Sequence, residues 1–194
     1  MTDDTRFPLL VALACHDLRT PLATVHGFAR TLARHGLEEP AARYVDMIEA
    51  ASRQLAELLD ELALVARIEA GRFEPRPTRV DSLELARAAA AELEDGVVHV
   101  TGDGATVWVE EDATRRAVRQ LARATRRHGG LESVDLRVQG HVIAISPVSA
   151  TAPGVVTGED LRELGAAAAV AFLRAAGASV ELDDGRLVIA LPTV

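Results

Sequence analysis

The chain has 194 residues with 29 acidic and 21 basic side chains, and its formal net charge of −8 argues against nucleic acid as a partner. Hydrophobic residues make up 48% of the chain and aromatic residues only 3%, so the core must be built from Ala, Leu and Val, which favours helices. A single cysteine excludes a disulfide framework, and the acidic N-terminus and the absence of a long apolar run predict a cytoplasmic protein with no membrane partner.

The N-terminal part of the chain reads as two long helices joined by a short loop. Residues 6–35 and 39–70 carry apolar side chains at alternating spacings of four and three, which is typical of a helix-packing seam. The predicted seam positions are Val11, Cys15, Leu18, Leu22, Val25, Ala29 and Leu32, followed by Tyr44, Ile48, Ala51, Leu55, Leu58, Leu62 and Val65. Gly36 and Gly71 are the predicted stops. Because two such helices cannot bury both flanks of their apolar faces, we expect an antiparallel hairpin that dimerises into a four-helix bundle.

The remainder of the chain predicts a small domain that mixes helices and strands. The proline-containing stretch 73–80 reads as a linker, so the expected domains are 1–75 and 76–194. The predicted helices cover 80–94, 112–130 and 159–176. The predicted strands are 97–103 and 106–112, joined by a turn at 102–104, and two hairpins over 132–148 and 179–192. This order of elements predicts an α+β fold, with a sheet of mixed strands and helices gathered on one of its faces.

A histidine on the first predicted helix is the strongest candidate for chemistry. His16 directly follows the seam residue Cys15, so it should lie beside the buried stripe and be exposed. Asp17 can accept a hydrogen bond from one ring nitrogen and leave the other as a nucleophile. Thr20 lies one turn further along the same face, where its hydroxyl can hold a water molecule. Arg19, between them in sequence, can face an incoming anion.

The segment CHDLRTPLATVHGFARTL resembles the phosphoacceptor box of sensor histidine kinases, whose general form is His, Glu or Asp, Leu, Arg, Thr, Pro, Leu. All seven positions match, from His16 to Leu22. The segment LLDELALVARIEAGRFEP resembles the second helix and exit of the same family's dimerisation and phosphotransfer hairpin, so the likeness covers residues 6–75. It implies that His16 carries a phosphoryl group, that Asp17 assists at the imidazole, and that Asp17 with Thr20 supports dephosphorylation of a partner.

The same resemblance implies two protein partners. The first is a second copy of the chain, which makes the protein a homodimer. The second is the receiver domain of a response regulator, which we expect to contact Arg19, Leu22 and Ala23.

The order of elements after residue 80 resembles the ATP-binding domain of these kinases, a small α/β sandwich, but its nucleotide motifs are missing. The family's Mg²⁺-binding Asn falls at Ala124, with Gln120 one turn earlier, and the chain contains no Asn at all. Residues 142–154 hold neither the Asp nor the paired glycines of the adenine motif, and only Gly165 remains of the glycine-rich phosphate segment. The likeness therefore implies a degenerate domain with no cofactor in this chain, and we expect Mg²⁺ to come from the response regulator.

These features together predict a phosphorelay protein of a two-component system. It would carry a phosphoryl group on His16 and exchange it with the aspartate of a response regulator, without ATP-dependent autophosphorylation. Three alternatives stay open on the sequence: an ATP-dependent sensor histidine kinase with a divergent nucleotide site, a response-regulator phosphatase, and a non-catalytic regulator-binding module.

Overall fold

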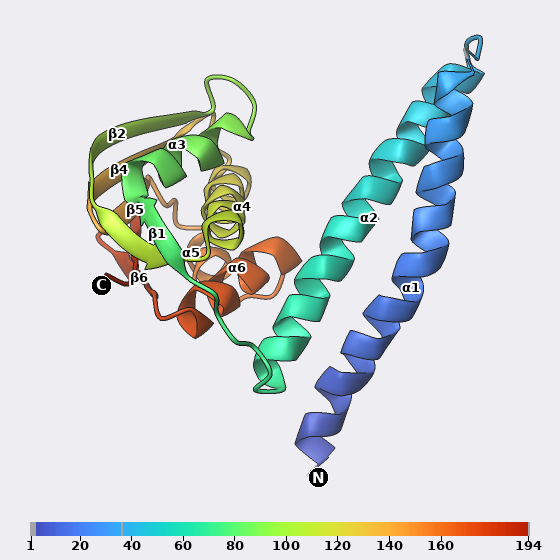
Figure 1. Cartoon of the computed structure of the whole chain (residues 1–194). Helices are drawn as coiled ribbons and strands as arrows, with labels where there is room; N and C mark the ends of the chain where they lie inside the picture. Colours follow the sequence, from blue (N-terminus) through green and yellow to red (C-terminus); the bar gives the residue numbers. More distant parts are fainter. Residues whose placement is uncertain (1–2, 36, 194) are drawn as a thin grey trace. The chain divides into compact units, whose positions relative to one another are not determined.

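The computed structural model describes residues 3–35 and 37–193, with side chains described at position 8 and from position 11 onward. The chain divides into two compact units, Met1–Arg72 and Phe73–Val194 (Figure 1). Phe73 belongs to the second unit because its ring packs edge to face on Phe172, with 5.8 Å between the ring centroids. The sequence predicts the domain boundary after position 75, whereas the second unit begins at Phe73. Residues 73–75 begin the segment that leads into the sheet domain.

The first unit is an antiparallel hairpin of two long helices, as the sequence predicts. Helix α1 spans Asp3–Arg34 and helix α2 spans Ala41–Glu69 (Figure 1). Helix α2 ends as predicted at Gly71, whose φ of 64° lies in the left-handed region that glycine tolerates best. The backbone N–H of Arg72 then donates to the carbonyl of Arg67 and closes the helix end. The stop predicted at Gly36 lies outside the described residues.

Small side chains pack the two helices of the hairpin together. Cys15 and Ala29 of α1 are buried, and so are Val45, Ser52 and Ala66 of α2. These positions recur every seven or fourteen residues, which is the repeat expected of a helix-packing seam. The Ser52 hydroxyl donates to the carbonyl of Ile48 at 2.7 Å, so its burial leaves no unsatisfied polar atom.

The seam predicted for α2 is therefore wrong by one position. The side chains facing α1 start from Val45, whereas the predicted stripe starts from Tyr44, which is exposed. The seam predicted for α1 is only partly buried. Cys15 and Ala29 are buried, whereas Leu18 and Val25 are exposed. The large aliphatic side chains thus lie beside the hairpin interface and not inside it.

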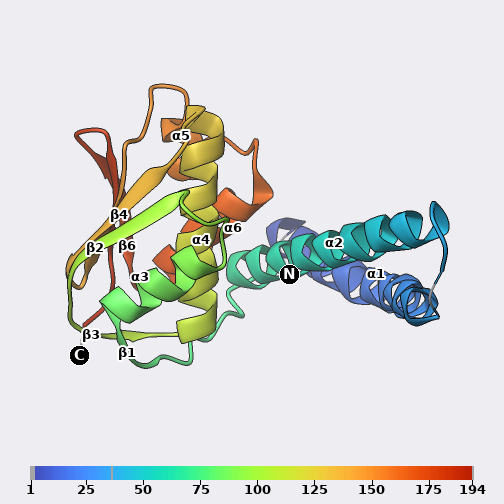
Figure 2. The same ribbon diagram turned by 90° about the horizontal axis from the view of Figure 1, so that it is seen from above.

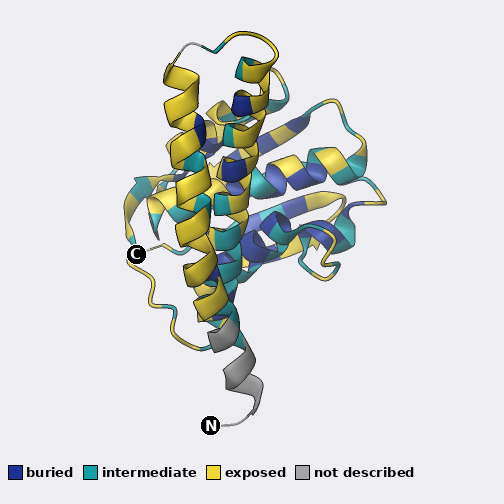
Figure 3. Ribbon diagram, turned by 90° about the vertical axis from the view of Figure 1, so that its right-hand side faces the viewer, coloured by how far each residue is buried: buried dark blue, intermediate teal, exposed yellow. Residues whose placement is uncertain are grey.

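An apolar stripe runs along the exposed surface of the hairpin. Exposed residues predominate over both helices (Figure 3). The large hydrophobic side chains among them are Leu13, Leu18, Val25, Phe28, Leu32, Tyr44, Met47, Ile48, Leu55 and Leu58. A row of aliphatic side chains in water is unfavourable, because burying each of them would contribute roughly 1.5–3 kcal/mol of free energy. We therefore expect a second copy of the hairpin to cover this stripe and complete a four-helix bundle.

Leu55→Asp should convert the protein to a monomer, because it places a charge in the expected dimer core without touching the hairpin interface. Leu55 is 52% exposed in the single chain, so the fold of each hairpin should survive. Ala50→Asp, at an exposed position of the same helix, is the matched control and should stay dimeric. Light scattering after size-exclusion chromatography checks both variants, and a monomeric unmutated protein would rule out the bundle.

The second unit is a five-stranded sheet with helices on one side. The sheet order is β2-β4-β5-β7-β6, where β2 is Val98–Gly104, β4 Val134–Gly140, β5 Val142–Ser146, β6 Ser179–Asp183 and β7 Arg186–Ala190. Strands β1 (Thr78–Asp81) and β3 (Thr106–Val109) form a separate antiparallel pair. Helices α3 (Ser82–Ala91), α4 (Glu111–Gly129) and α6 (Leu164–Ala175) lie on one side of the strands (Figure 2). The fold is thus α+β, a helical hairpin followed by an α/β sheet domain.

Alternation along the strands explains why one face of the sheet is covered. In β4, Val134, Leu136 and Val138 are buried while the residues between them are exposed, which is the period of two expected for a half-buried strand. The final hairpin turns where the sequence predicts, at Asp184 and Gly185, which both have the positive φ of a tight hairpin turn. No helix in the described part of the chain is both long enough and apolar enough to cross a membrane.

Three local predictions in this unit are wrong. The stretch 73–80 is not wholly a linker, because its last three residues begin strand β1. Residues 102–104 are not a hairpin turn but the end of β2, which pairs in parallel with β4. Gly102 adopts a φ of 115°, and any side chain there would overlap the carbonyl oxygen of Val138 on the neighbouring strand. The helix predicted over 159–176 begins only at Leu164, and the short helix α5 (Pro153–Val156), which we did not predict, precedes it.

Candidate phosphoacceptor site

The imidazole of His16 stands in solvent on the surface of α1. Its side chain is 76% exposed, although its neighbour Cys15 is buried against α2. Thr20 and Ala23 follow at spacings of four and three, so they share the face of His16, and both are exposed. The structure therefore brings three of the predicted residues together on one open strip of helix surface.

Asp17 orients the imidazole. Its Oδ1 lies 3.1 Å from Nδ1 of His16. An ionised carboxylate only accepts hydrogen bonds, so this contact places the ring proton on Nδ1 and leaves a lone pair on Nε2. Because Asp17 is itself 69% exposed, the pair contributes little to stability. The contact favours one tautomer of a ring that water can reach.

The helix around His16 has one irregular backbone position. Pro21 has no N–H, so the carbonyl of Asp17 lacks the donor that an unbroken helix would supply. One turn further on, the carbonyl of Thr20 accepts a hydrogen bond from the Thr24 hydroxyl at 3.2 Å, in addition to its place in the helix. The Thr20 side chain itself is exposed beside the imidazole face.

Arg19 is tied to the other helix of the hairpin. Its Nη2 lies 2.7 Å from Oδ1 of Asp60, and both side chains are largely exposed. Sequence reasoning missed Asp60, because the pair is 41 positions apart and depends on the register of the hairpin. The one available signal is that Asp60 belongs to the segment that resembles the family's second helix. The contact uses one of five N–H donors of the guanidinium, so Arg19 keeps donors for a second anion.

The three residues predicted to contact a partner occupy different surroundings. Arg19 and Ala23 are exposed, whereas Leu22 is half-buried. Leu22 lies midway between Cys15 and Ala29 in the seven-residue repeat, which turns it toward α2. Its side chain therefore supports the hairpin and presents only part of its surface to a partner.

Two positions of the second unit differ from the nucleotide-binding motifs that the resemblance leads us to expect. Ala124 is fully buried inside α4, so the position carries no ligating oxygen and no free surface. Gly165, at the start of α6, packs so closely on α4 that an added Cβ would lie 3.0 Å from the side-chain carboxamide of Gln120. Within the described ranges, no group of three or more His, Cys, Asp and Glu residues is placed to hold a metal ion.

Comparison with known proteins relates the hairpin to one family. Residues 9–71 match the His Kinase A (phospho-acceptor) domain. Probable sensor histidine kinase TcrY of Mycobacterium tuberculosis is 31% identical over 93 residues, which are 47% of this chain and 18% of that protein. Histidine protein kinase DivJ of Caulobacter vibrioides is 30% identical over 113 residues, which are 55% of this chain and 19% of that protein. The chain thus spans less than a fifth of the length of these two relatives.

Solved structures share the fold of both units. Full-length ShkA, crystallised in complex with AMPPNP, matches with a TM-score of 0.71 at 21% identity over 95% of this chain and 46% of that one. The ATP-binding domain of PrrB from Mycobacterium tuberculosis matches with a TM-score of 0.50 at 25% identity over 61% of this chain and 98% of that one. The hairpin thus matches the phospho-acceptor domain of histidine kinases, and the sheet domain that follows it shares the fold of these solved structures.

Proposed function

We propose that the protein is a histidine phosphotransfer component of a two-component system, which takes a phosphoryl group from the aspartate of one receiver domain onto His16 and passes it to another. One observation carries the proposal: Asp17 holds Nδ1 of an imidazole that is 76% exposed, so Nε2 faces solvent as a free nucleophile. The free cysteine suits a protein of the reducing cytosol, and the exposed apolar stripe of the hairpin supports a homodimer.

The proposed transfer needs only residues of this chain and an incoming receiver domain. The Nε2 lone pair of His16 forms a nitrogen–phosphorus bond as the bond from phosphorus to the receiver's aspartate oxygen breaks, and the aspartate leaves as a carboxylate. The ring keeps its Nδ1 proton and gains positive character, which the carboxylate of Asp17 offsets. Phosphoryl transfer depends mainly on alignment and charge neutralisation, so a receiver domain can supply the Mg²⁺ in both directions. His16 is the acceptor in the first transfer, and the aspartate of the second receiver domain is the acceptor in the next.

ATP plays no part in this proposal, and two features of the second unit support leaving it out. Ala124 offers no metal ligand, and the first turn of α6 is packed against α4 at Gly165 and the fully buried Ala166. A polyphosphate needs backbone N–H groups that it can approach closely at such a helix start. In this proposal the sheet domain does not supply the phosphoryl group.

A second function has a specific observation in its favour. TcrY and DivJ are both called histidine kinases, and the ShkA structure contains the nucleotide AMPPNP. An ATP-dependent kinase with a divergent nucleotide site is therefore the main rival. The two functions differ in the phosphate donor, which a labelling experiment can identify directly.

His16→Ala should abolish labelling from a radiolabelled phospho-receiver domain, because it removes the attacking nitrogen, while binding of that domain stays nearly intact. His35→Ala, which removes another exposed histidine of the hairpin, should label like the unmutated protein. Labelled ATP with Mg²⁺ should label none of the three. Labelling of the unmutated chain by ATP would establish the kinase, and a labelled His16→Ala variant would refute the phosphoacceptor assignment. Binding without any labelling would point to an interaction module.

Thr20→Ala should keep the transfer to His16 and slow hydrolysis of the receiver's phosphoaspartate about tenfold, since the hydroxyl no longer positions a water near the phosphoryl group. Thr24→Ala is the matched control, because it removes an exposed threonine hydroxyl one turn further along α1. Release of inorganic phosphate from the phospho-receiver measures the effect. Equal hydrolysis rates in both variants would assign Thr20 a purely structural role and remove the support for a phosphatase activity.

Arg19→Gln should slow transfer to His16 about tenfold, because the variant loses a cation one turn from the incoming phosphoryl group. Arg30→Gln changes the charge of the same helix by the same amount at a more distant exposed position and should transfer normally. Asp60→Asn should have a smaller effect than Arg19→Gln, because an exposed ion pair holds Arg19 only weakly. Rapid-quench labelling gives the three rates, and a normal rate for Arg19→Gln would exclude a role in transfer.

A further inference from the structure

The segment that leads from the hairpin into the sheet domain is fastened to the second unit at two points. Residues 73–77, which we call the linker strap, form neither helix nor strand (Figure 1). The half-buried ring of Phe73 packs edge to face on Phe172 of α6, which is only 1% exposed. Three residues further on, the backbone N–H of Arg76 donates to Oε1 of Glu110 at 2.6 Å. The second unit therefore holds the linker strap by one ring and one hydrogen bond.

The hydrogen bond at Glu110 uses a side chain that does not cap its own helix. Glu110 is the residue before α4, where a short polar side chain usually accepts from the first turn. Its side chain makes no such bond and accepts from Arg76 instead. A charged acceptor makes this bond stronger than one between neutral groups. Pro75 and Pro77 flank Arg76 and restrict the φ angles of the strap, so less conformational entropy is lost when it is held.

The linker strap begins where the hairpin ends. The N–H of Arg72 donates to the carbonyl of Arg67 and closes helix α2, and the next residue is Phe73, whose ring is held on the second unit. While that ring is docked, the unfastened backbone between the units is confined to the junction of Arg72 and Phe73. Release of the ring frees the chain as far as Arg76, which is about 10 Å of extended backbone at roughly 3.3 Å per residue.

We infer that Phe73 is a latch, whose release lengthens the connection between the two units and lets the sheet domain move independently of the hairpin. Glu74, Pro75 and Arg76 are exposed in the docked strap, so Phe73 is the one strap residue before Arg76 that loses burial on release. A segment with so few buried contacts opens locally without unfolding the unit that holds it. The inference involves no residue near His16, so its failure would leave the proposed phosphotransfer untouched.

Hydrogen exchange at the Arg76 amide, followed by NMR on the full chain, tests whether Phe73 holds the strap. Phe73→Ala should raise the exchange rate of this amide at least about tenfold, because the strap then leaves Glu110 more often. Leu161→Ala is the matched control, since it removes a side chain of the same unit that is 78% exposed, and it should leave the rate unchanged.

The chain's single tryptophan reports the motion of the second unit. Trp108 lies in β3, which pairs with the strand that follows the strap, so the decay of its fluorescence anisotropy follows the tumbling of this unit. Phe73→Ala should shorten the slow phase of that decay about twofold, because the freed unit tumbles faster than the whole molecule. Leu161→Ala should leave the decay unchanged.

Circular dichroism establishes that each variant is folded before it is measured. Should Phe73→Ala unfold, Phe73→Gln decides by the same two measurements, because its methylene groups still cover part of Phe172. A folded variant whose Arg76 amide exchanges at the rate of the unmutated chain overturns the inference, since the strap would then hold without the ring. So does faster exchange with an unchanged anisotropy decay, and so do effects that Leu161→Ala reproduces.

Discussion

Close packing of small side chains between α1 and α2 determines which other side chains of the hairpin are exposed. Cys15 and Ala29 approach Val45, Ser52 and Ala66, and every other position of both helices takes its orientation from that contact. The large aliphatic residues are left on one flank, where a second hairpin can cover them. His16 is left in solvent, one position beyond Cys15. The interface of the hairpin thus sets both the expected dimer surface and the reactive one.

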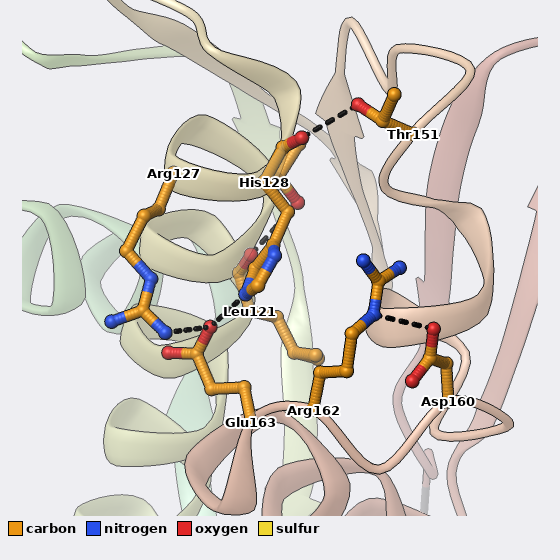
Figure 4. Close-up of polar contacts among 8 residues, drawn as sticks. Leu121, Arg127, His128, Thr151, Asp160, Arg162 and Glu163 are labelled. Carbon is orange, nitrogen blue, oxygen red and sulfur yellow. Dashed lines mark hydrogen bonds and ion pairs between the residues drawn. The ribbon is translucent and has the colours of Figure 1, made fainter.

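The charged side chains near His16 and those at the end of α4 differ in their exposure and pairing. On the hairpin, His16, Asp17 and Arg19 are exposed, and their contacts with one another and with Asp60 are weak enough to be exchanged for contacts with an incoming partner. In the sheet domain, Glu163 and His128 are largely buried and paired with each other (Figure 4). The charged groups of the hairpin are therefore open to a partner, whereas Glu163 and His128 stabilise the sheet domain.

Much of this architecture was predictable from the sequence, and the exceptions have physical causes. The hairpin and the exposure of His16 followed from a local repeat. The seam of α2 was misplaced by one position because the stripe that starts at Tyr44 is the more apolar one, whereas the buried stripe that starts at Val45 includes the polar Ser52. Small side chains, and not the most apolar ones, allow the other helix to approach. The parallel pairing of β2 with β4 joins strands separated by α4, and nothing local in residues 102–104 indicates it. The partners of Arg19 and Glu163 likewise depend on contacts between distant segments.

The missing N–H of Pro21 has a mechanical consequence for α1. A helix resists bending through its ladder of backbone hydrogen bonds, and the bond from position 21 to the carbonyl of Asp17 is absent from that ladder. The bending stiffness of α1 is therefore reduced within one turn of His16, as it also is near Pro8 in the first part of the helix. A force that bends the 32-residue helix therefore produces more curvature at these two positions than in its unbroken turns. The exposed imidazole of His16 thus lies beside the more central of two weakened positions in α1, where bending of the helix changes the direction of the ring.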